Sequence, residues 1–176
     1  MMNIILIGFR GTGKTAAGKL VARRLGWEFI DADDYLEKKT GKGIATIFDE
    51  GGEKLFRQIE ESVIAELCGL EHKVIAAGGG AVLSKKNVKN MKKSGMVVLL
   101  EADADTIYER LKADAKTRSQ RPRLTDKDMH DEVVHLLDYR RKYYDKAADY
   151  RIDTSKRPPE EVAEEIVTAF EEKLST

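Results

Sequence analysis

A run of eight residues near the N-terminus has the residue types and spacing needed to hold phosphate groups. Residues 8–15 read GFRGTGKT and match the pattern G-x-x-x-x-G-K-[ST] in full. Glycines let the backbone approach anionic oxygens, and the loop amides and the following helix N-terminus then face the ligand. Lys14 is expected to reach the β- and γ-phosphates of a nucleoside triphosphate, and the Thr15 hydroxyl to ligate Mg²⁺. The motif predicts a nucleotide site but does not separate a metabolite kinase from a GTPase or an ATPase.

Two carboxylates follow the second apolar run of the chain. Asp31 and Asp33 lie at the predicted carboxyl end of a strand, which is where open α/β sheets bind ligands. Strand alternation would point both side chains the same way. One could then serve the metal shell while the other accepts a proton from a substrate hydroxyl. A strand end followed by a helix N-cap, where Asp is common, explains the pair equally well.

A possible anion clamp and a glycine turn follow further along the chain. Arg57 and Glu60 are one helical turn apart, so the glutamate could orient the guanidinium toward a carboxylate ligand. The alternative is a solvated surface pair that contributes only a few tenths of a kcal/mol, roughly. Gly78–Gly80 end the third apolar run. Three consecutive glycines lose much backbone entropy when the chain folds, and a ligand that lies against the bare backbone would explain why they are there. A plain loop is the alternative there.

The elements that must position these residues alternate along the chain. Val-, Ile- and Leu-rich runs at 3–7, 27–30, 74–77, 96–100 and 150–152 predict five strands, with helical patterns between them. Such strands indicate a parallel sheet covered on both faces, hence a three-layer α/β/α fold. A helical insertion at 35–70, with breaks near Gly41–Gly43 and Gly51–Gly52, is expected to carry substrate specificity. The polar segment 114–123 is predicted to be an exposed, mobile loop.

Length, charge and cysteine content limit the classes of protein to which this sequence can belong. The 176 residues fit one domain, and 31 basic residues balance 31 acidic ones. Zero net charge argues against nucleic acid as the main partner. The single cysteine, Cys68, excludes an intramolecular disulfide, and no apolar stretch approaches the roughly 20 residues that span a bilayer. Cys68 is expected to pack as a small hydrophobe, and the three histidines lack a metal-ligand spacing. These features predict a cytoplasmic protein, with no membrane partner.

The order and spacing of these motifs resemble shikimate kinase, within the nucleoside monophosphate kinase-like group of phosphate-loop proteins. The resemblance extends over roughly residues 3–170, and the phosphate loop is its most specific part. Its further motifs are Asp31-x-Asp33, Gly52-Glu53, Phe56-Arg57-x-x-Glu60, Gly78–Gly80, Arg121-Pro122, Arg140-x-x-x-Tyr144 and Ala148-Asp149.

The resemblance implies transfer of the γ-phosphate of ATP to the 3-hydroxyl of shikimate, with Mg²⁺ as the metal. It implies one domain over 1–176, with a substrate-binding region at about 33–61 and a lid at about 112–125. The residues it assigns to ATP are Gly11, Thr12, Gly13, Lys14, Thr15, Ala16, Arg110 and Arg121, with Arg110 against adenine and Arg121 in the lid. Those it assigns to shikimate are Asp33, Arg57, Glu60, Gly78, Gly79, Gly80 and Arg140. Thr15 and Asp31 are assigned to the metal, and Lys14, Asp33 and Arg121 to catalysis.

Two positions affect these assignments. The lid of the family usually reads Arg-Pro-Leu-Leu, whereas residues 121–124 here read RPRL, which places an extra charge beside the ATP site. Arg141 is adjacent to Arg140 and competes for the same role. The spacing to Tyr144 favours Arg140.

Two other functions are compatible with the sequence. One is a kinase for another acceptor, such as gluconate or a nucleoside monophosphate. The other is a catalytically weak homologue that senses ATP or a metabolite. An intact set of catalytic residues argues against a sensing role, and the arginine pair favours a compact acceptor that carries a carboxylate. The expected partners are therefore ATP, ADP and shikimate, bound by a monomer.

Overall fold

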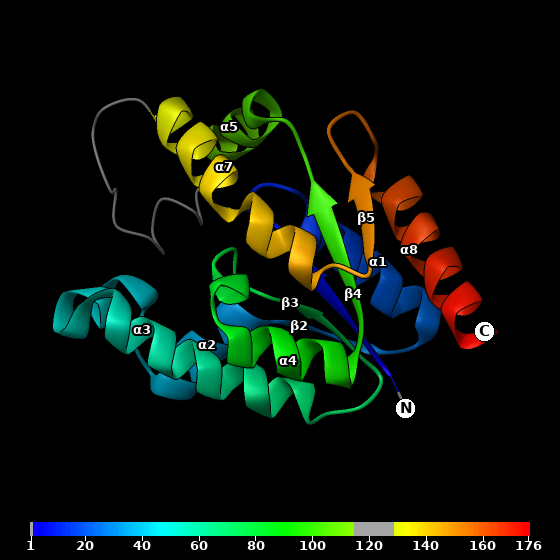
Figure 1. Cartoon of the computed structure of the whole chain (residues 1–176), viewed down its shortest axis with the longest axis horizontal. Helices are drawn as coiled ribbons and strands as arrows, with labels where there is room; N and C mark the ends of the chain where they lie inside the picture. The colour runs from blue at the N-terminus through cyan, green and yellow to red at the C-terminus, as the bar shows by residue number, and fades with distance from the viewer. Residues whose placement is uncertain (1, 115–128) are drawn as a thin grey trace.

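Five parallel strands form a single sheet at the centre of the computed structural model, which describes residues 2–114 and 129–176 (Figure 1). Their order across the sheet is β2-β3-β1-β4-β5, and every neighbouring pair is parallel. All five predicted strands are confirmed, with ends that differ by at most one residue. Their bounds are β1 Asn3–Ile7, β2 Glu28–Asp31, β3 Lys73–Ala76, β4 Gly95–Glu101 and β5 Tyr150–Asp153.

Helices cover both faces of the sheet, as the three-layer prediction requires. Residues of β1 alternate between the layers: Ile4 and Leu6 pack with α1 and α8, whereas Ile5 and Ile7 pack with α2, α3 and α4. Helix α7 adds its C-terminal end to the second of these layers and packs against α5 at its other end. The bounds are α1 Lys14–Leu25, α2 Ala32–Thr40, α3 Ile44–Cys68, α4 Lys85–Ser94, α5 Ala104–Ala113, α7 Met129–Ala147 and α8 Pro159–Leu174, with a 3₁₀ turn η1 at Ala81–Leu83.

The helical insertion breaks where its glycines predict. Helix α2 ends at Thr40, and Gly41 adopts a left-handed φ of 67° as its C-cap. Helix α3 is interrupted at Gly52, where φ is 67° and ψ is −166°. Residues with a Cβ rarely adopt that backbone conformation, so glycine permits the kink that redirects the second half of α3.

One local prediction about the acidic pair is wrong. Helix α2 begins at Ala32, three residues before the predicted start, so Asp33 lies in the first helical turn and not on a strand. Strand alternation therefore does not align Asp33 with Asp31. Asp31 caps the helix: its Oδ1 accepts hydrogen bonds from the amides of Asp33 (3.0 Å) and Asp34 (3.1 Å).

Two further sequence predictions concern Cys68 and the lid. Cys68 packs against the core on the α3 side, and burial raises the pKa of its thiol to about 11 although a hydrogen bond with Ser94 opposes that rise. The thiol therefore stays protonated near neutral pH, as expected of a packing residue. Most of the predicted lid, Arg121 included, lies outside the described residues. Among the described helices, none combines the length and apolar character that crossing a membrane requires.

A partly exposed junction at Asp149 ties the sheet to both helical layers, and its removal is expected to destabilise the protein. Asp149 Oδ2 accepts from the Val97 amide (3.0 Å) and from Lys173 of α8 (3.1 Å), and Oδ1 accepts from Lys92 of α4 (3.3 Å). Burial alone would raise the pKa of this carboxyl, but the Val97 amide and the two ammonium groups outweigh it and lower that pKa. Because both lysines are solvent-exposed and asparagine keeps an acceptor for the Val97 amide, we expect Asp149→Asn to lower the free energy of unfolding by about 0.5–1.5 kcal/mol at pH 7.

Urea titration of both proteins measures this difference. A lowered folded-state pKa contributes stability above the unfolded pKa of about 3.9, and that contribution is lost as pH falls through the folded value. The difference between Asp149→Asn and wild type is therefore expected to shrink in acid. Asp145→Asn is the matched control, because Asp145 pairs with Arg151 at the exposed surface. Equal stabilities for Asp149→Asn and the control would contradict the assigned role.

Candidate active site

The phosphate loop joins the end of β1 to the start of α1. Gly11 and Gly13 have φ values of 78° and 91°, which lie in the region that favours glycine. Lys14 Nζ donates to the carbonyl oxygens of Gly8 (2.7 Å) and Phe9 (2.9 Å), so the ammonium group lies against the loop itself. A flexible lysine that rests on loop carbonyls can exchange them for phosphate oxygens.

The metal assignment rests on two oxygen groups beside the loop. The Thr15 hydroxyl lies 3.4 Å from Asp31 Oδ2, while Oδ1 of the same carboxylate caps α2. A hydroxyl and a carboxylate oxygen are hard donors of the kind that Mg²⁺ prefers. The residues present therefore fit a magnesium ion held by Thr15, with Asp31 oriented toward the same position.

A cleft of about 290 Å³ brings most of the predicted nucleotide residues together with part of the predicted acceptor set. The predicted acceptor residues that do not line it are Arg57, Glu60, Gly80 and Arg140. The cleft lies where the ends of β1, β2 and β3 meet, as expected for ligands at the carboxyl edge of a parallel sheet. Thr12 is the exception among the loop residues, because its buried hydroxyl donates to Phe9 O (2.8 Å) and its side chain lines a different cavity. The predicted site residues that line the cleft are Gly11, Gly13, Lys14, Thr15, Ala16, Asp31, Asp33, Gly78, Gly79 and Arg110.

The side chains predicted to bind the acceptor converge on the glycine turn after β3. A Cβ on Gly78 would lie 2.9 Å from Asp33 Oδ1 and 3.1 Å from Glu60 Oε2. A Cβ on Gly80 would lie 2.3 Å from a terminal nitrogen of Arg57. Side chains from α2 and α3 therefore occupy the space that a Cβ at Gly78 or Gly80 would need. This close approach explains the glycines better than the alternative of an ordinary loop does.

Arg57 and Glu60 form the predicted pair, and it is not a solvated surface pair. Arg57 NH1 donates to Glu60 Oε1 at 2.8 Å, and the Glu60 side chain is only 3% exposed. Glu53 Oε1 approaches the other edge of the guanidinium at 3.4 Å. Two carboxylates thus hold the guanidinium in one orientation, and the fork can present its remaining donors to a ligand carboxylate.

Helix α7 directs its two adjacent arginines to different places. Arg140 is buried, its guanidinium lies 5.4 Å from the Phe9 ring centre, and NH1 would be 3.3 Å from a Cβ on Gly79. One turn later, the Tyr144 hydroxyl donates to the Gly79 carbonyl at 2.6 Å. The R-x-x-x-Y spacing therefore places both side chains against the glycine turn. Arg141 is exposed and lines a separate cavity.

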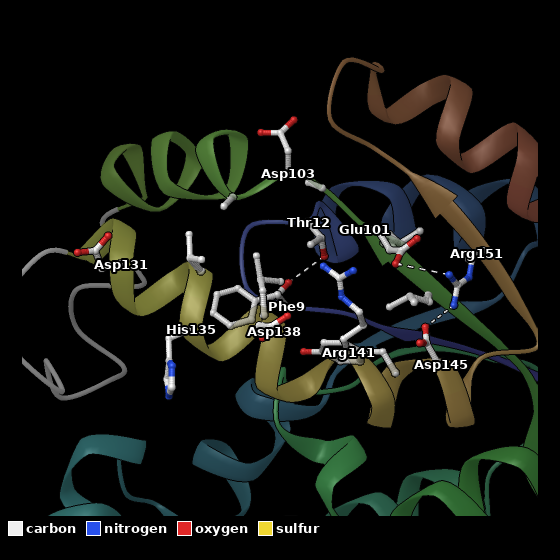
Figure 2. Close-up of a pocket in the computed structure, with 17 residues that line it drawn as sticks. Phe9, Thr12, Glu101, Asp103, Asp131, His135, Asp138, Arg141, Asp145 and Arg151 are labelled. Carbon is white, nitrogen blue, oxygen red and sulfur yellow. Dashed lines mark hydrogen bonds and ion pairs between the residues drawn. The ribbon is translucent and has the colours of Figure 1, made fainter.

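That second cavity is larger but lacks the chemistry of the cleft. It encloses about 700 Å³ between α7, the start of α5 and the end of β4, and it touches the phosphate loop only through Phe9 and Thr12 (Figure 2). Arg151 lies at one edge, paired with Asp145 at 2.5 Å and with Glu101 at 4.0 Å. Neither Lys14 nor Asp33 lines it. The smaller cleft is therefore the candidate active site.

Arg110 and Thr154 form a buried contact with the phosphate loop, and sequence reasoning missed the threonine. Arg110 NH1 donates to Gly11 O (3.0 Å) and to Thr154 Oγ1 (3.2 Å), and NH2 donates to Thr154 O (2.8 Å). The Thr154 hydroxyl donates to Thr12 O at 2.8 Å. A lone threonine after the last strand has no motif of its own, so only the fold reveals this contact.

The glycine turn leads to a direct prediction: Gly80→Ala is expected to raise the KM for the acceptor about 10-fold or more. The backbone at Gly80 (φ −98°, ψ 3°) accepts alanine, but the new Cβ would meet the end of the flexible Arg57 side chain. The guanidinium would move and the protein would still fold. Acceptor titrations with a thermal-melting control measure both effects. Gly43→Ala is the matched control, because a Cβ there meets nothing closer than 3.6 Å. An unchanged KM for Gly80→Ala would remove Arg57 from the acceptor site.

The fold and this cleft define the chain as a phosphate-loop kinase that acts on a small molecule. A family model described as shikimate kinase matches residues 10–171. Shikimate kinase from Thermodesulfovibrio yellowstonii is 46% identical over 171 residues, covering 97% of this chain and 96% of that one. Shikimate kinase from Caldanaerobacter subterraneus is 41% identical, with 97% and 96% covered. The chain belongs to the shikimate kinase family.

Solved structures agree with this assignment. Shikimate kinase from Acinetobacter baumannii, in complex with shikimate, superposes with a TM-score of 0.91 at 33% identity, covering 98% of this chain and 94% of that one. A gluconokinase from Sinorhizobium meliloti has a TM-score of 0.56 at 15% identity, covering 97% and 92%. That likeness shows the fold alone, so it does not favour gluconate as the acceptor.

Proposed function

We propose that this protein transfers the γ-phosphate of ATP to the 3-hydroxyl of shikimate, giving shikimate 3-phosphate and ADP. The observation that carries the proposal is the convergence of Asp33, Arg57 and Arg140 on the glycine turn beside the phosphate loop. One anionic ligand that also carries hydroxyl groups would engage all three side chains. Family membership supports the same acceptor.

The nucleotide side neutralises charge as the phosphoryl group moves. Lys14 leaves its loop carbonyls and binds phosphate oxygens, while the loop amides donate to the same groups. Thr15 would hold Mg²⁺ and Asp31 would orient the surroundings of that ion, which would supply further positive charge beside the phosphates. Arg121, which lies outside the described residues, is proposed to arrive with the lid and exclude water.

The acceptor side positions the attacking oxygen. The Asp33 carboxylate accepts the proton of the 3-hydroxyl as the oxygen bonds to the γ-phosphorus, and ADP leaves with the electrons of the broken P–O bond. Arg57 and Arg140 bind the shikimate carboxylate, and Glu60 keeps Arg57 in place. A neutral analogue would leave both guanidiniums without that anion, so the pair supplies specificity.

The remaining proposals concern organisation. We place the substrate-binding region at about 33–61 and the lid at about 112–125 within a single domain. Arg110 is proposed to contact adenine through the face of its guanidinium group, which its hydrogen bonds to the phosphate loop leave open. The protein is proposed to act as a cytoplasmic monomer without nucleic acid or membrane partners, which the zero net charge and the single cysteine support.

A coupled assay of ADP release tests the function. Purified protein with ATP and Mg²⁺ is expected to release ADP rapidly only when shikimate is added, because water is a poor acceptor in a closed site. Gluconate and a nucleoside monophosphate serve as control acceptors at the same concentration. No stimulation by shikimate, together with stimulation by a control acceptor, would contradict the assignment and leave the kinase class standing.

A further inference from the structure

Two carbonyl groups of the phosphate loop accept hydrogen bonds from the buried side chain of Thr154 and the partly buried side chain of Arg110. Thr12 O receives the Thr154 hydroxyl at 2.8 Å, and Gly11 O receives Arg110 NH1 at 3.0 Å. Thr154 is only 3% exposed. Both donors lie beyond the loop in sequence, one at the end of β5 and the other on α5.

The hydroxyl proton of Thr154 can be assigned from its neighbours. A threonine hydroxyl donates one hydrogen and can accept others. The Glu101 carbonyl, 3.1 Å away, already receives the Thr154 amide at 2.7 Å, whereas Thr12 O is closer to the hydroxyl at 2.8 Å. The proton therefore serves Thr12 O, and Arg110 NH1 donates to a lone pair of the same hydroxyl at 3.2 Å.

The orientation of these carbonyls decides where the loop amides point. No described peptide bond is cis, and in a trans peptide the C=O of one residue and the N–H of the next point in opposite directions. With Thr12 O turned into the buried Thr154 hydroxyl, the Gly13 amide faces the cleft that Gly13 and Lys14 line. By the same geometry, the Gly11 carbonyl points toward Arg110 and the Thr12 amide points the opposite way.

We propose that Thr154 is a positioning residue that, with Arg110, holds the phosphate-loop carbonyls inward so that the loop amides face the nucleotide phosphates. Glycines leave the loop free to rotate its peptide planes, and a rotated plane would present a carbonyl oxygen to an anion. The two donors prevent that rotation before the nucleotide arrives. This inference rests on the proposed binding of nucleotide phosphates by the loop.

Calorimetric titration with ADP and Mg²⁺ tests the proposal in three variants. Thr154→Val keeps the side-chain shape but removes the donor, and we expect it to weaken ADP binding about 10-fold while shikimate binding stays within about twofold. Thr154→Ser restores a hydroxyl and is expected to bind ADP within about twofold of wild type. Thr168→Val is the matched control, because Thr168 is exposed on α8 and bonds only within its helix.

Three outcomes separate the possible failures. Wild-type ADP affinity in Thr154→Val, whatever its melting temperature, would overturn the positioning role. Equal losses of ADP and shikimate affinity in Thr154→Val and Thr154→Ser would overturn it too, since they would reveal a general structural defect. Failure of the wild-type protein itself to bind ADP would reject the proposed nucleotide site. If Thr154→Val does not fold, Thr154→Ala replaces it, because alanine also lacks the hydroxyl donor, with the same expected loss of ADP affinity.

Discussion

Asp33→Asn is expected to lower kcat by about 10²–10⁴-fold while the affinity for ATP changes by less than about twofold. Asparagine keeps the shape and one acceptor oxygen of the side chain but cannot take up the proton of the acceptor hydroxyl. Asp33 lies at the acceptor end of the cleft, where its Oδ1 would be 2.9 Å from a Cβ on Gly78. Its loss should therefore affect the chemical step more than the binding of the nucleotide.

Steady-state kinetics and equilibrium ADP binding measure the two effects separately. Asp34→Asn is the matched control, because Asp34 carries the same charge on the next residue of α2, is exposed, and does not line the cleft. That variant is expected to keep a kcat within about twofold of wild type. A near-normal kcat in Asp33→Asn would show that Asp33 is not the proton acceptor.

Arg140→Ala is expected to raise the KM for shikimate about 10²-fold and to leave the KM for ATP within about twofold. Truncating one partner of a buried charge pair costs about 2–5 kcal/mol, which corresponds to a change in affinity of roughly 30-fold or more. Arg140 is buried against Phe9 and the glycine turn, so it has few alternative positions. Removal of its charge therefore leaves the acceptor carboxylate with Arg57 alone.

The adjacent residue supplies a stringent control. Arg141→Ala makes the same chemical change one position along α7, but Arg141 is exposed and faces the larger cavity, so its KM values are expected to stay near wild type. Melting temperatures of both variants check that lost packing on Phe9 does not explain the effect. If Arg141→Ala raised the KM and Arg140→Ala did not, the two assignments would have to be exchanged.

Local patterns predicted the parts of the site that local sequence determines. The phosphate loop, the five strands, the breaks at Gly41 and Gly52 and the Arg57–Glu60 pair each depend on residues close together in the chain. The runs that form β1, β3 and β4 are short and rich in Val, Ile or Leu, and their length and β-branched content favour strands over buried helices. Spacing on a helix likewise placed Arg57 beside Glu60.

Contacts between distant segments were not predictable in the same way. The start of α2 at Ala32 was missed because the short polar run after β2 has little helical periodicity, yet Asp31 caps it. The glycine turn requires glycine because α2, α3 and α7 each direct a side chain against it. Thr154 meets Thr12 across 142 positions of sequence, and no pattern in either segment announces that hydrogen bond.

The position of the transferred phosphate tests the central claim most directly, because it depends on how the cleft orients the acceptor. Phosphorus NMR of the product formed from ATP and shikimate is expected to show one phosphomonoester, coupled to the proton on carbon 3 of the ring. That result would mean that the hydroxyl beside Asp33 attacks while Arg57 and Arg140 hold the carboxylate. A phosphoryl group on another hydroxyl, or a mixture of products, would contradict the proposed arrangement of acceptor and clamp.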